Sequence, residues 1–211
     1  MEITISPIWF VAKQAIYNSL KEGEIKGIFN NLVEREVFAL SDSSQKICVT
    51  YANHLSRQVI NCAKKCQHSI AFEFLEELES LPLYYKTYQG IINATLLPTK
   101  AYYFYCIGDF ASSIQMLDQE REELMSGRLY HSKILCSLRL LQSQINRYKV
   151  VIACRHIEEA LLIAQNIFNE IELQLMPSIG SCSEDWVRLG MGVELLVLLQ
   201  RSDYSIGIKK T

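Results

Sequence analysis

The sequence predicts an all-α protein with about nine helices. Apolar residues recur at steps of three and four through most of the 211 residues, which is the spacing of one face of an α-helix. The chain has only 4 Pro and 9 Gly, and it contains no Asn-Gly or Asp-Gly pair of the kind that closes a β-hairpin. No segment sustains the period-two alternation of a half-buried strand. Long helices are therefore the expected elements.

The first part of the chain is expected to form two helical hairpins, at residues 7–40 and 43–81. Ser6 as an N-cap and Pro7 in the first turn favour a helix start at this point. The second hairpin follows a Ser-rich loop and is expected to end at Pro82, because proline usually stops a helix.

Two further hairpins, at 84–126 and 130–175, and a terminal helix at 183–202 complete the expected single domain over residues 1–211. The clearest apolar stripe lies in the fourth hairpin, where Glu and Asn residues fill the opposite side of the helix. The stripe consists of Ile157, Leu161, Ala164, Phe168, Ile171 and Leu175.

The hairpins repeat one pattern at the start of each second helix, where a large residue is followed three positions later by a second, usually small, residue. A small residue lets two helices approach closely, and a large one packs between them. The pairs are Ile25 and Ile28, His68 and Ala71, Phe110 and Ser113, and Ile157 and Ala160. Repeats of this kind indicate stacked helical hairpins, while a closed helical bundle has the same stripes and stays an alternative.

The segment AYYFYCIGDFASSIQML, at residues 101–117, has a small and an aromatic residue before a Gly-Asp-Phe turn and a small and a large residue after it. These residues are Ala101, Phe104, Gly108, Asp109, Phe110, Ser113 and Leu117. The pattern resembles the middle of a tetratricopeptide repeat, although Lys100 replaces an apolar residue, the closing Pro is absent and the period exceeds the family's roughly 34 residues. The resemblance implies a divergent tetratricopeptide-like superhelix that acts as a non-enzymatic protein- or peptide-binding scaffold or adaptor.

Aromatic residues are concentrated between residues 84 and 105. Four consecutive aromatic residues on a helix point in four directions, so Tyr103 and Phe104 can pack inside while Tyr102 and Tyr105 share another face. Exposed tyrosines are typical of binding hot spots, and the alternative is that the adjacent repeat covers both. The family resemblance implies that they face the concave groove. The expected partner-binding residues are Tyr102, Tyr105, Thr95, Pro98, Arg139 and Gln142.

Residues 49–59 support an alternative function. Their Asn-His-Leu-Ser-Arg string, Asn53 to Arg57, is similar to the turn and recognition helix of AraC-type regulators, which implies a DNA-binding or transcription-associated regulator. A polar helix face explains the same residues. A net charge of −2 and a pI near 6.1 lack the basic surplus that phosphate neutralisation uses, so nucleic acid is an unlikely partner.

The sequence favours neither a catalytic site nor a metal site. A zinc site could be formed by two cysteines and two histidines, Cys62, Cys66, His68 and His54. Because cysteines are often buried as small apolar side chains, no metal or cofactor is expected. The sequence contains no phosphate-binding loop, dinucleotide fingerprint, zincin motif or nucleophile elbow. We expect no enzyme activity.

The cysteines and the chain ends favour a cytoplasmic protein. Seven Cys, an odd number, and no secretory signal predict reduced thiols, and no apolar segment is long enough to span a membrane. The terminal helix is apolar on every side from Leu195 to Leu199, which predicts either a homodimer contact or a buried final helix.

Overall fold

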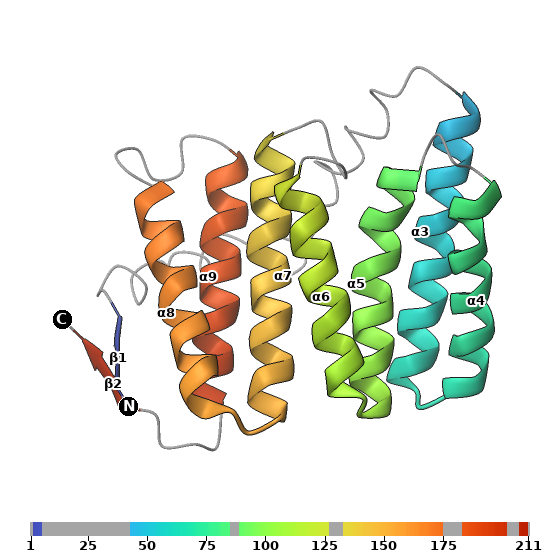
Figure 1. The fold of residues 1–211 in the computed structure, drawn as a ribbon. Coiled ribbons are helices and arrows are strands. Elements are labelled where there is room, and N and C mark those ends of the chain that lie inside the picture. Colours follow the sequence, from blue (N-terminus) through green and yellow to red (C-terminus); the bar gives the residue numbers. More distant parts are fainter. Residues whose placement is uncertain are drawn as a thin grey trace. The chain divides into compact units, whose positions relative to one another are not determined.

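The computed structural model describes residues 2–5, 43–84, 89–126, 133–174, 183–201 and 207–210, and the expected hairpin at 7–40 lies outside these residues (Figure 1). Seven helices within the described ranges confirm the predicted helical architecture, while the count of about nine stays a prediction. They are α3 (Ser43–Lys64), α4 (His68–Tyr84), α5 (Gln89–Ile107), α6 (Phe110–Met125), α7 (Lys133–Ala153), α8 (Ile157–Gln174) and α9 (Ser183–Arg201).

Pro82 does not end its helix, because α4 continues to Tyr84. A proline inside a helix removes the hydrogen bond to the carbonyl four residues earlier, and this loss is tolerated where the rest of the helix packs well. Leu75, Leu78 and Leu81 of the same helix are buried, so tertiary packing outweighs the local signal of Pro82.

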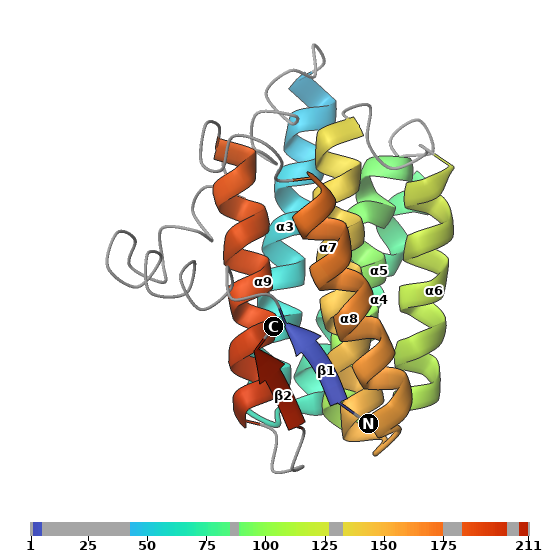
Figure 2. The ribbon, with the colours of Figure 1, turned by 90° about the vertical axis from the view of Figure 1, so that its left-hand side faces the viewer.

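Two short strands accompany the helices. The strands β1 (Glu2–Ile5) and β2 (Gly207–Lys210) pair in parallel, with Glu2 opposite Gly207, and β1 contacts α8 (Figure 2). Each strand has four residues, which is too short for an alternating pattern to stand out in the sequence.

The contacts divide the chain into two compact units. One is Val33–Ser143, and the other combines Met1–Leu32 with Gln144–Thr211, so the boundary falls inside α7. The single domain over 1–211 stays a prediction.

The unit Val33–Ser143 is built from packed neighbouring helices. Helix α3 contacts α4 and α5, α4 contacts α5, and α5 contacts α6 (Figure 1). Its main core is a cluster of residues at three- and four-residue steps, which is why these segments fold as amphipathic helices. The cluster consists of Cys48, Ala52, Leu55, Val59, Ala63, Ala71, Leu75, Leu78, Leu81, Ile92, Leu96 and Tyr103.

In the other unit, the C-terminal half of α7, α8 and α9 supply the core. The predicted stripe of α8 is confirmed at Leu161, Ala164, Phe168 and Ile171, which are at most 1% exposed. Ile157 is half-buried, and Leu175 lies outside the described residues. Val193, Leu195, Leu196 and Leu199 of α9 are also buried within the chain.

Three turns between helices share one hydrogen-bonding pattern. After α3, the Gln67 N–H donates to the Cys62 carbonyl at 2.9 Å. The Cys66 N–H donates to the Ala63 carbonyl at 3.0 Å. This pair of bonds is a Schellman motif, which ends a helix with one residue in the left-handed region. The left-handed residues of the three turns are Cys66, Gly108 and Arg155, with φ of 58°, 83° and 64°.

The small residues of the repeated pattern lie where each second helix meets the first. Ala71, Ser113 and Ala160 are all 0% exposed. The Ser113 hydroxyl donates to the Ala101 carbonyl at 2.8 Å, which joins α6 directly to the backbone of α5. A larger side chain at these positions would hold the two helices apart. The earlier pair at Ile25 and Ile28 lies outside the described residues.

Candidate partner-binding surface

Three of the six predicted binding residues lie on one face of α5. Pro98, Tyr102 and Tyr105 follow one another at steps of four and three, so they form a single row along the helix. Tyr105 is 36% exposed, and Pro98 and Tyr102 are half-buried. We call this row the tyrosine face.

The two tyrosines of this face differ in their surroundings. Their ring centroids lie 6.4 Å apart, and Tyr105 also lies 5.9 Å from the ring of Phe110 in α6. Tyr102 packs against the core cluster, and burial together with the hydrogen bond to Cys106 raises the pKa of Tyr102 to about 12. Tyr102 is therefore partly a core residue, and Tyr105 is the more accessible of the two.

Helix α3 borders the tyrosine face. The Nζ atom of Lys64 lies 6.0 Å from the centroid of the Tyr102 ring, which is within the range of a cation–π contact. The exposed Arg57 stands two helical turns before Lys64, and therefore near the same side of α3. The edge of the face thus combines aromatic rings with cationic side chains.

Thr95 is turned into the contact between α3 and α5, so it offers little surface to a partner. Thr95 is 8% exposed, and its hydroxyl donates a hydrogen bond to Oδ1 of Asn53 at 3.1 Å. One turn further along, the Thr99 hydroxyl donates to the Thr95 carbonyl at 2.6 Å and lies 2.6 Å from the Ser56 hydroxyl. Because the single proton of Thr99 is already used, Ser56 must donate to Thr99.

Arg139 and Gln142 lie on α7, and the charge of Arg139 interacts with Glu120, a buried acid of α6. Glu120 is 2% exposed and accepts a hydrogen bond from the Ser143 hydroxyl at 2.8 Å. Burial raises the pKa of Glu120, while the charge of Arg139 and the bond from Ser143 oppose this shift. Gln142 is half-buried. The structure brings neither residue together with the tyrosine face in any described contact.

Residues 49–59 lie inside a single continuous helix, α3, which runs from Ser43 to Lys64. The turn that the likeness to AraC-type regulators requires is therefore absent from this segment. Val49, Ala52, Leu55 and Val59 are at most 2% exposed and belong to the packed side of the helix. Tertiary packing explains the apolar positions, while His54 and Arg57 are exposed.

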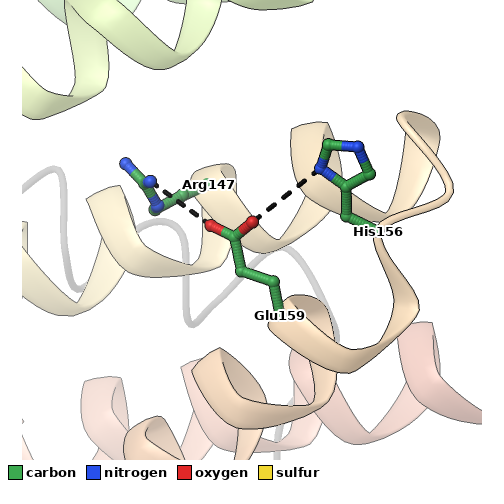
Figure 3. Close-up of polar contacts among 3 residues, drawn as sticks. All are labelled: Arg147, His156 and Glu159. Atoms are coloured by element: carbon green, nitrogen blue, oxygen red, sulfur yellow. Dashed lines mark hydrogen bonds and ion pairs between the residues drawn. The ribbon is translucent and has the colours of Figure 1, made fainter.

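The residues that suggested a zinc site lie along α3 and at the turn into α4. Cys62 and Cys66 belong to the turn after α3, and within the described ranges no three His, Cys, Asp or Glu side chains could together hold a metal ion. Glu159 lies in the first turn of α8. Its Oε1 is 3.4 Å from Nη2 of Arg147 in α7, and its Oε2 is 3.8 Å from Nδ1 of His156, so this carboxylate joins α8 to α7 (Figure 3).

None of the helices that the structure describes is long and apolar enough to cross a membrane. Comparison with protein-family models, with curated proteins and with solved structures finds no match to this chain.

Proposed function

We propose that this protein is a non-enzymatic, tetratricopeptide-like scaffold of the cytoplasm that binds a protein segment or peptide through the tyrosine face. In this proposal the helical hairpins stack into a superhelix, and no metal or cofactor takes part. Solution scattering distinguishes such a stack from a closed bundle.

The observation that carries the proposal is the exposed Tyr105 between two further rings, on a helix that packs against α3, α4 and α6. Exposed tyrosines supply a large, rigid contact area at a small cost in side-chain entropy, and a cation beside them adds direction to the contact. The repeated hairpin turn and the buried Ser113 support the tetratricopeptide-like part of the proposal. A homodimer through α9 has less support, because its apolar residues Val193 to Leu199 are largely covered within the chain.

The test is the substitution Tyr105→Ala, after cross-linking and mass spectrometry have identified the partner. We expect binding to weaken by about 2 kcal/mol, since a hot-spot tyrosine is lost. The melting temperature should change little because the side chain is 36% exposed. Tyr102→Ala should lower the melting temperature more strongly, since its ring packs against the core.

Tyr51→Ala is the matched control. Tyr51 is 42% exposed on α3 and bonds to Glu77 of α4, away from the tyrosine face. Its loss should leave the affinity unchanged. The proposal fails if Tyr105→Ala binds the partner as tightly as the parent protein.

A further inference from the structure

The charged residues within helices α3, α4, α5 and α6 are sorted by helix. Helices α3 and α5 contain Lys46, Arg57, Lys64 and Lys100 and no Asp or Glu. Helices α4 and α6 carry the acidic residues, with Arg121 as their one Lys or Arg. These acids are Glu73, Glu76, Glu77, Glu79, Asp118, Glu120, Glu122 and Glu123.

Some of these charged residues form ion pairs between helices, and others form none. Lys100 pairs with Glu79 at 2.7 Å, which ties α5 to α4. Among the residues that the structure describes, Arg57 and Lys64 are exposed and form no ion pair. Lys64 instead lies over the ring of Tyr102. Two of the cations that form no ion pair, Arg57 and Lys64, therefore stand at the edge of the tyrosine face.

The two helices that form this surface run in the same direction. Asn53 bonds to Thr95 and Ser56 to Thr99, so the contacts advance together along α3 and α5. Arg57 and Lys64 are seven residues apart, which places them about 10 Å from one another along α3. An extended chain covers this distance in about three residues.

We infer that the tyrosine face takes an acidic segment of another protein, in an extended conformation, with two carboxylates on the same side of the segment, two or four residues apart, and an apolar side chain beside them. The carboxylates meet Arg57 and Lys64, and the apolar side chain lies on Tyr105. Charge complementarity favours this occupant, since α3 and α5 contain no carboxylate. The neighbouring carboxylate of Asp109 caps α6, where it accepts from the Ser112 N–H. The inference rests on the proposed function and specifies its partner.

The experiment uses the full chain and three immobilised libraries of short peptides around one fixed apolar residue. The flanking positions are Glu and Ser in the first library, Gln and Ser in the second, and Lys and Ser in the third. We expect the acidic library to bind best and its binding to weaken as salt is added. Arg57→Glu and Lys64→Glu should each reduce this binding by about tenfold. Tyr105→Ala should reduce it as well.

Arg121→Glu, the same charge reversal on the exposed side of α6, is the control and should leave binding unchanged. Lys64 lies in the last turn of α3, where its positive charge interacts favourably with the helix dipole, so Lys64→Glu also removes this interaction. Arg57 lies in the middle of α3, so Arg57→Glu leaves the interaction intact. Circular dichroism checks that both variants fold.

Four results would overturn the inference. Equal binding of the Gln and Glu libraries that still depends on Tyr105 would reject the acidic partner and keep the proposed function, whereas no peptide binding at all would count against both. A concentration-dependent dimer that Arg57→Glu abolishes would assign the surface to a second copy of this chain. Tighter binding of duplex DNA than of any library would assign it to nucleic acid.

Discussion

Tyr148 is buried in α7 at 1% exposure, and its hydroxyl has no hydrogen-bond partner in the described part of the chain. Burial raises the pKa of Tyr148 to about 12. A buried hydroxyl without a partner has lost its bonds to water and gained none, so Tyr148→Phe should raise the free energy of unfolding by about 1 kcal/mol. Urea denaturation measures this change. A loss of stability would show that the hydroxyl is bonded in the folded protein.

Glu120 makes stability depend on pH. Because burial raises its pKa in the folded state, the folded protein binds more protons than the unfolded chain just above the ordinary Glu pKa of about 4.3. Stability from this group therefore falls as the pH rises from that value through the higher folded pKa. The Glu120→Gln side chain cannot titrate, so the stability of this variant relative to the parent protein should increase as the pH rises over this range. Thermal melting at several pH values checks the direction, and parallel curves would contradict it.

At the scale of the helical hairpin, the three Schellman turns differ in the residue at the left-handed position. Gly108 adopts this conformation freely, whereas Arg155 pays a steric cost for its Cβ. Arg155→Gly should raise the free energy of unfolding by roughly 0.5–1 kcal/mol, and Gly108→Ala should lower it by about 1 kcal/mol. No atom lies within 4 Å of a Cβ added at Gly108, so the second change isolates the backbone effect.

Denaturant titration of both variants provides the measurement. Asn166→Gly, at an exposed position inside α8, is the control and should lower stability, because glycine disfavours an ordinary helix. Equal effects of Arg155→Gly and Asn166→Gly would mean that the left-handed position carries no strain.

At the scale of the whole molecule, a net charge of −2 argues against DNA as the partner. Duplex DNA titrated at physiological salt should bind no more tightly than non-specific complexes do, which means a dissociation constant of roughly micromolar or weaker. Fluorescence anisotropy with a pool of duplexes measures this affinity. Tight binding that falls steeply with added salt would support the DNA-binding alternative, with the exposed His54 and Arg57 of α3 as the candidate contacts.

Local periodicity was enough to predict the described helices and much of their buried sides. The stripe in α8 and the starts of α6 at Phe110 and α8 at Ile157 follow from residues close in sequence, because helix formation depends on neighbours three and four positions apart. The tyrosine face could likewise be predicted at Pro98, Tyr102 and Tyr105, which lie on one helix.

Contacts between helices decided the rest. The burial of Thr95 depends on Asn53, which is 42 residues away in sequence, and that of Glu120 depends on α7. A left-handed Arg155 and a proline inside α4 at Pro82 both oppose the local preferences of these residues, and the packing of the adjoining helices outweighs these preferences. The sequence by itself determined the helices and their apolar sides, whereas only the tertiary structure decided which polar residues face a neighbouring helix, since that depends on side chains far away along the chain.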